Sequence, residues 1–138
     1  MAHKPYELLP HTADIKMRAY GQSPEELFKN AVKGMFAICG PRAREPREEA
    51  RRDIQTTSGN RTYLLIDFLS DCLCLADTHN EAYDAVDVRE LTENSITAIV
   101  TGYKIETFEH TEIKAVTYHD AKIEQENGLW SATVLFDI

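Results

Sequence analysis

The stretch DIKMRAYGQSPEELFKNAVKGMF (residues 14–36) places a strand pattern directly before a helix pattern. Apolar and polar residues alternate over 14–20, which predicts a strand with one buried face. Gly21 then interrupts the alternation. The apolar members of the strand are Ile15, Met17 and Ala19.

The helix that follows has a well-marked beginning. Ser23 can cap the first turn, Pro24 suits the first helical position, and Glu26 can complete a capping box. Apolar residues then recur at helical spacing, so we expect the helix to reach about Ile38 and to end before Gly40.

The rest of the chain predicts one more helix and several strands. The second helix is expected over 61–77, with Asp67 and Asp71 on its solvent side. Asn127-Gly128 indicates a hairpin turn. Strands are expected over 50–57, 82–90, 95–105, 115–124 and 129–137. Residues 1–138 therefore predict a single α+β domain, a mostly antiparallel β-sheet with two main helices packed on one face.

The composition excludes some classes of protein. The 138 residues carry a formal net charge of −8, which disfavours direct nucleic-acid binding and suits a basic partner or a bound cation. No apolar stretch approaches the length of a membrane span, and the first residues lack the apolar core of a secretory leader. We therefore expect no membrane association and a cytoplasmic location.

The three cysteines indicate a reducing compartment. An odd number of cysteines without the spacing of a small disulfide scaffold argues against disulfides. Joint metal ligation by Cys72 and Cys74 is disfavoured, because positions i and i+2 of a helix point in different directions. We expect buried thiols at Cys39, Cys72 and Cys74.

The segment 41–52 is the most charged part of the chain, with five arginines among three glutamates. A mixed charge run of this kind is typical of a solvated loop entering a strand. A docking surface for a phosphate-bearing partner is the alternative, and the interleaved glutamates weaken it.

Carboxylates lie near both ends of the sequence. Asp14 is at the start of the first predicted strand, and Asp137 is at the end of the last one. If these strands pair antiparallel, both aspartates and the terminal carboxylate of Ile138 project together. Such a group needs compensation, and all-oxygen donors suit Ca²⁺, Mg²⁺ or Mn²⁺. His11 could add a ligand or order the loop, and both aspartates could instead be merely structural.

Four segments resemble the archease family. The opening PHTADIKMRAYGQSPEELFKNAVKGMF (10–36) is similar to the family's His-Thr-Ala-Asp strand and capped helix. YLLIDFLSDCLCLAD (63–77), TEIKAVTYH (111–119) and the ending VLFDI (134–138) resemble later family segments in the same order. The Lys-Ala-Val-Thr-Tyr run with a final Asp-Ile is the most specific part of this resemblance.

The resemblance implies a function that composition does not. Archeases are accessory proteins of the RtcB-type tRNA-splicing RNA ligase. They promote the guanylylation of a ligase histidine, support multiple turnover and can broaden nucleotide use. The family implies a divalent metal, Ca²⁺ foremost, held by Asp14, Asp137 and Ile138. The chain is thus expected to be a non-enzymatic activator that meets RNA only through its ligase partner.

Lys114, His119 and Asp71 are the candidates for the surface that meets the ligase. Lys114 could contact a phosphate, although a strand lysine or a histidine beside polar neighbours is often merely solvated. The periodicity of 113–123 is irregular, which indicates a bulge or a short helical turn. Three positions depart from the family pattern and leave less negative charge, namely Pro10, Tyr103 and Ser70.

Two other functions stay open at this point. A stand-alone metal-dependent phosphoesterase would use the two aspartates as ligands and His119 as a general base. The sequence has no glycine-rich phosphate loop or recognisable nucleophile arrangement to support it. A non-catalytic interaction module would use the carboxylates only structurally.

Overall fold

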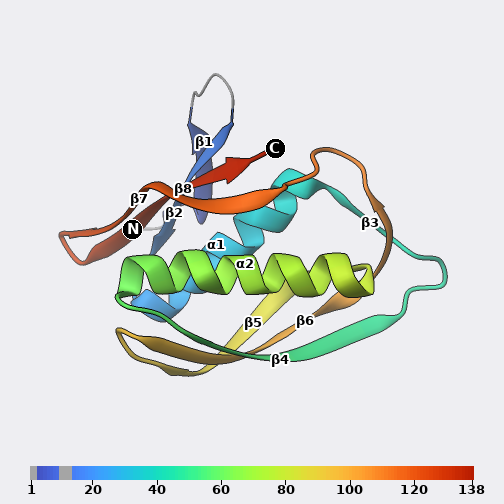
Figure 1. The fold of residues 1–138 in the computed structure, drawn as a ribbon, viewed down its shortest axis with the longest axis horizontal. Helices are drawn as coiled ribbons and strands as arrows, with labels where there is room; N and C mark the ends of the chain where they lie inside the picture. Colours follow the sequence, from blue (N-terminus) through green and yellow to red (C-terminus); the bar gives the residue numbers. More distant parts are fainter. Residues whose placement is uncertain (1–2, 10–13) are drawn as a thin grey trace.

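The computed structural model describes residues 3–9 and 14–138, and it contains two helices and eight strands within those ranges (Figure 1). The helices are α1 (Pro24–Cys39) and α2 (Arg61–His79). The strands are β1 (Tyr6–Leu9), β2 (Ile15–Gly21), β3 (Pro41–Ala43), β4 (Glu49–Thr57), β5 (Glu81–Leu91), β6 (Ser95–Phe108), β7 (Ala115–Glu126) and β8 (Leu129–Asp137).

The strands form two antiparallel sheets with the helices between them (Figure 1). One sheet has the order β1-β2-β8-β7, and the other has the order β3-β6-β4 with β5 also paired to β6. Helix α1 contacts β2 and β5, and α2 contacts β7 and β4, so each helix touches both sheets. The predicted α+β class is confirmed. The expected single sheet is two sheets, each covered on one face by the helices.

The buried position of α2 explains its composition. A helix packed on one layer needs one apolar stripe, whereas α2 also buries Ile66 and Leu73 because a sheet lies on either side. Asp67 and Asp71 nevertheless keep the solvent side that the sequence predicts. The large buried side chains of the core come from both helices and both sheets, and they include Met17, Phe28, Leu65, Phe68, Tyr83 and Phe136.

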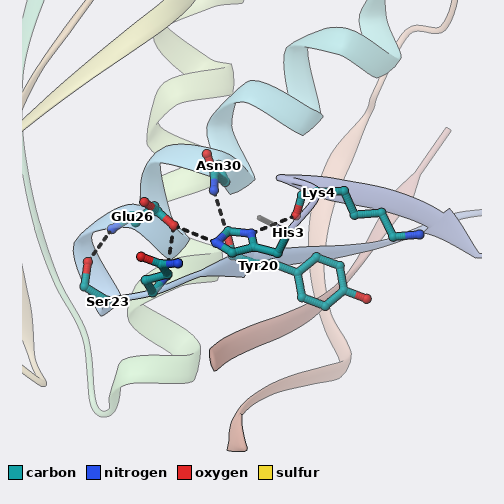
Figure 2. A network of polar contacts seen from close by, with 7 residues as sticks. His3, Lys4, Tyr20, Ser23, Glu26 and Asn30 are labelled. Atoms are coloured by element: carbon teal, nitrogen blue, oxygen red, sulfur yellow. Dashed lines mark hydrogen bonds and ion pairs between the residues drawn. The ribbon is translucent and has the colours of Figure 1, made fainter. Parts of the chain in front are cut away.

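The predicted cap of α1 is confirmed, and it also anchors the N-terminal segment (Figure 2). The backbone N–H of Glu26 donates to Ser23 Oγ at 3.1 Å. The Glu26 carboxylate reaches one residue further back than a standard capping box, and Oε1 accepts the Gln22 N–H at 2.9 Å. The same oxygen lies 3.0 Å from His3 Nε2, which ties the segment before β1 to the start of the helix.

Two short strands have no sequence prediction. β1 has four residues and β3 has three, so neither is long enough to show a clear alternation. β3 begins directly after Gly40, whose left-handed φ of 66° ends α1 and turns the chain onto β6. The predicted bulge in 113–123 is present as a register shift between Thr117 and Lys122.

The prediction for the cysteines is wrong at one position. Cys39 and Cys72 are buried free thiols, but Cys74 is exposed. Residues two apart on a helix point about 200° apart, so burial of Cys72 turns Cys74 toward solvent. Within residues 3–9 and 14–138 no helix has the length and apolar character needed to cross a membrane.

Candidate functional site

The pairing of β2 with β8 brings the two predicted aspartates to one place. The strands are antiparallel, and Ile15 lies opposite Phe136. Extending this register by one residue sets Asp14 opposite Asp137. The strand neighbourhood that the sequence predicts is therefore confirmed. Asp14 is half-buried and Asp137 is exposed, so the pair lies at the solvent edge of the sheet.

A third strand supports the end of β8. The backbone N–H of Lys114 donates to the carbonyl oxygen of Asp137 at 2.7 Å. Ala115 pairs with Asp137 in the register of β7 and β8. The main chain of Asp137 is thus held from the β7 side while its carboxylate is exposed. The backbone of Lys114 therefore lies next to that of Asp137, and the Lys114 side chain is exposed.

The donor set fits a hard cation. Asp14 and Asp137 supply carboxylate oxygens from opposed strand ends, and the carboxylate of Ile138 follows directly after Asp137. Within the described ranges no three side chains of His, Cys, Asp or Glu are close enough together to hold a metal ion. The third ligand that the resemblance predicts is the main-chain carboxylate of Ile138, so the predicted site would contain only two of these side chains. His11 and Pro10 lie outside the described residues.

A shallow hollow lies between the second half of α2 and the start of β7. Burial, followed by the nearby charge of Glu112, raises the pKa of Asp77 above its ordinary value. Sequence reasoning did not single out this hollow, although Ser70, Cys74 and Asp77 recur at helical spacing on the solvent side of α2. Its lining consists of Ser70, Leu73, Cys74, Asp77, Thr78, Lys114, Ala115 and Val116.

His119 and Asp71 do not join the aspartate pair. The register shift in β7 places His119 beside the middle of β8, between the pairs Thr117–Leu135 and Lys122–Thr133. Its Nε2 lies 3.6 Å from Asp120. Asp71 belongs to α2 and accepts a hydrogen bond from the Thr56 hydroxyl at 2.6 Å. Of the three partner-surface candidates, only Lys114 adjoins Asp137.

The bulge in β7 orders a contact that the sequence did not reveal. The Tyr118 hydroxyl donates to Asp67 Oδ1 on α2. This hydrogen bond raises the pKa of Tyr118, because the neighbouring carboxylate favours the protonated phenol. The rings of Tyr118 and Tyr63 meet edge to face, with their centroids 5.0 Å apart. The irregular periodicity of 113–123 was the available signal of this feature.

The arginines of 41–52 are largely matched by acids of the same chain. Arg42 lies 3.5 Å from Glu109, and the Arg47 guanidinium pairs with Glu49 and also lies over the Tyr103 ring. These contacts favour the solvated, internally paired interpretation over a phosphate-docking surface.

The comparisons with known proteins point to one family. The sequence profile described as the archease protein family matches residues 6–138. The "Protein archease" of Methanosarcina mazei is 39% identical over 142 residues, covering 98% of this chain and 97% of that protein. The "Protein archease" of Thermococcus gammatolerans is 36% identical, covering 96% of this chain and 98% of that protein.

Solved structures show the same fold. The solution structure of protein 1598 from Methanobacterium thermoautotrophicum superposes with a TM-score of 0.73 at 31% identity, covering 97% of this chain and 99% of that one. The crystal structure of an archease described as a possible chaperone, from Thermotoga maritima, gives a TM-score of 0.70 at 27% identity, covering 100% of this chain and 98% of that one.

The class of protein is a two-sheet α+β domain with two helices, the fold that the two solved archease-like structures share. The chain belongs to the archease family.

Proposed function

We propose that this chain is an accessory protein of an RtcB-type tRNA-splicing RNA ligase, in which it promotes guanylylation of the ligase and supports multiple turnover. The resemblance to archeases supports this role, and so does the family membership of the chain. A relative of solved structure is described as a possible chaperone, which agrees with action on a protein partner. The chain itself performs no catalysis in this proposal.

The observation that carries the proposal is the opposition of Asp14 and Asp137 across β2 and β8. Together with the carboxylate of Ile138 they would hold a divalent cation, Ca²⁺ foremost and Mg²⁺ or Mn²⁺ otherwise. The bound cation would supply positive charge where the ligase handles its nucleotide phosphates. The β7 side fixes the main chain of Asp137 through the Lys114 N–H, which positions the residue that carries the carboxylate.

Lys114 is placed to assist from the adjoining strand. The Lys114 side chain is exposed, and the Lys114 backbone N–H donates to the carbonyl oxygen of Asp137. A lysine ammonium is a compact charge suited to a phosphate oxygen. It would orient the nucleotide of the ligase and widen the range of nucleotides used. The free cysteines agree with a reducing, cytoplasmic setting.

The test is a ligation time course with RNA in excess over a cognate RtcB-type ligase. Wild-type chain should give repeated turnover, and the Asp14→Ala/Asp137→Ala variant should not. The matched control is Asp53→Ala/Asp87→Ala, which removes two exposed acids from the other sheet and alters net charge equally.

Three results would contradict the proposal in different ways. Full stimulation by the aspartate variant would remove the carboxylate site while keeping the ligase partner. No stimulation by wild-type chain with a competent ligase would remove the ligase role. Turnover of a phosphate ester by the purified chain would favour the phosphoesterase alternative.

A further inference from the structure

Two tyrosines and two aspartates form a continuous surface across α2 and β7. Tyr63, Asp67 and Asp71 follow one another at spacings of four residues, so they lie along one stripe of the helix. Tyr118 reaches this stripe from the bulge of β7, through its hydrogen bond to Asp67. We call Tyr63, Asp67, Asp71 and Tyr118 the tyrosine–aspartate surface.

The two rings are unusually open for large aromatic side chains. Tyr63 is 45% exposed and Tyr118 is 53% exposed, and they are two of the four exposed large hydrophobic residues of the described chain. Their edge-to-face contact fixes both rings relative to each other. Exposed, ordered tyrosines are typical anchors of protein interfaces, because they bury much area at a small entropic cost.

Several cations of the sheet that contains β7 are paired with acids. Lys16 lies 3.9 Å from Asp120, and His119 lies 3.6 Å from the same carboxylate. Lys122 lies 3.7 Å from Glu124.

Besides Lys114, which directly precedes β7 and lines the hollow with Ser70 and Cys74, a further cation on these elements is Arg61. Its guanidinium lies 5.7 Å from the centroid of the Trp130 ring, two residues before Tyr63 and on another side of the helix. Asp67 and Asp71 accept hydrogen bonds from Tyr118 and Thr56, and neither is ion-paired with a lysine or arginine of the described chain. The surface therefore keeps negative charge beside exposed aromatic rings.

The same chain shows what this combination of groups binds. The Arg47 guanidinium lies 4.3 Å from the centroid of the Tyr103 ring. Its Nε is 3.1 Å from Glu49, and its Nη2 is 3.7 Å from Asp84. One tyrosine face and two carboxylates thus surround one arginine, through a cation–π contact, one charge-assisted hydrogen bond to Glu49 and a longer ion pair with Asp84.

We propose that the tyrosine–aspartate surface docks an arginine-bearing segment of a protein partner. The guanidinium would stack on an exposed tyrosine ring and donate to the aspartate oxygens not used by Tyr118 and Thr56. RNA is the less suitable occupant, because the two carboxylates repel phosphate although the rings can stack on bases. This inference rests on the proposed function in one respect, namely that the protein partner is the ligase.

The first arm of the test uses a fluorescent hexa-arginine peptide and a fluorescent single-stranded RNA of matched length at physiological salt. Wild-type chain should bind the peptide and not the RNA. The Tyr63→Ala/Tyr118→Ala variant should bind the peptide at least about tenfold more weakly, since both stacking faces are lost. Asp67→Asn should weaken binding, and Asp53→Asn, with the same charge change on the other sheet, should not.

Other results of this arm would overturn the proposal. These are no peptide binding by wild type, equal weakening by Asp67→Asn and Asp53→Asn, or RNA binding that the tyrosine variant abolishes. The substituted positions are solvent-facing, and thermal unfolding of each variant would verify that the fold is kept.

The second arm titrates each variant into the ligation assay. The chain concentration that gives half-maximal stimulation should rise at least about tenfold for the tyrosine double variant, with the maximal rate unchanged. An unchanged half-maximal concentration, with wild type active, overturns the docking surface and leaves the proposed function standing. If wild type does not stimulate the ligase, the proposed function fails, and the peptide arm still decides the docking surface.

Discussion

At the scale of single residues, Glu81 is a buried charge with several hydrogen-bond donors. Its side chain is completely buried. Arg52 donates two hydrogen bonds to it at 3.0 and 2.7 Å, Lys104 donates one at 2.7 Å, and the Tyr83 hydroxyl donates another at 2.7 Å. The Arg52 hydrogen bonds, more than offsetting burial, lower the pKa of Glu81 to about 2.

This carboxylate should make stability depend on pH in the acid range. The folded pKa of Glu81 lies below its unfolded value near 4.5, so ionised Glu81 stabilises the fold above that pH. The contribution is lost as the pH falls from about 4.5 to about 2. We expect urea midpoints of the wild type to fall through this window and those of Glu81→Gln to fall less steeply.

The control for this measurement is Glu90→Gln, an exposed acid on the same strand. Its pH profile should match that of the wild type. A Glu81→Gln profile parallel to the wild type between pH 4.5 and 2 would show that other carboxylates cause the acid sensitivity. At neutral pH the Glu81→Gln change should lower the unfolding free energy by about 3 kcal/mol, because Arg52 and Lys104 lose their ionised partner.

At the scale of elements, the close approach of β5 and β6 depends on one glycine. Gly102 pairs with Tyr83 just before a bulge in β5. A Cβ built on Gly102 would lie 1.8 Å from the carbonyl oxygen of Ala82 and 2.7 Å from Tyr83 Cα. Both atoms belong to the backbone, so neither can move aside without disturbing the strand pairing.

Gly102→Ala should therefore destabilise the protein by about 3 kcal/mol, at the upper end of overpacking effects. Gly59→Ala is the matched substitution, because a Cβ at Gly59 meets nothing within 4 Å. It should change the unfolding free energy by no more than about 0.5 kcal/mol. Denaturant unfolding of both variants tests the difference, and equal effects would contradict the account of Gly102.

Local signals explain which elements the sequence predicts. The capping signal at Ser23 predicts the start of α1, apolar spacing predicts α2, and alternation predicts the long strands. β3 follows no such pattern, because a three-residue strand in an arginine-rich segment forms only through its partner β6. The division into two sheets is equally non-local, since it depends on which strand pairs β6 and which pairs β8.

At the scale of the whole molecule, the two ends of the sequence meet in one sheet while the helices separate that sheet from the other (Figure 1). The opposition of Asp14 and Asp137 could be predicted from two alternations and an assumed pairing. The tyrosine–aspartate surface could not, because Tyr118 reaches Asp67 only through the bulge and the packing of β7 on α2. The residues that meet on one pair of strands can be predicted from sequence alternation. The residues that meet between a helix and a sheet can be predicted only when the packing of the layers is known.

The proposed cation should consequently stabilise the whole fold, independently of any ligase. A ligand that binds only the folded state at 100 times its Kd adds about 2.7 kcal/mol to the unfolding free energy. For a chain of this length this corresponds to a rise in Tm of about 8 °C. Saturating Ca²⁺ should produce such a rise in the wild type and in Asp53→Ala/Asp87→Ala, but not in Asp14→Ala/Asp137→Ala. Differential scanning calorimetry with and without a chelator measures it. An equal rise in all three proteins would assign the effect to general screening of the −8 charge rather than to the aspartate pair.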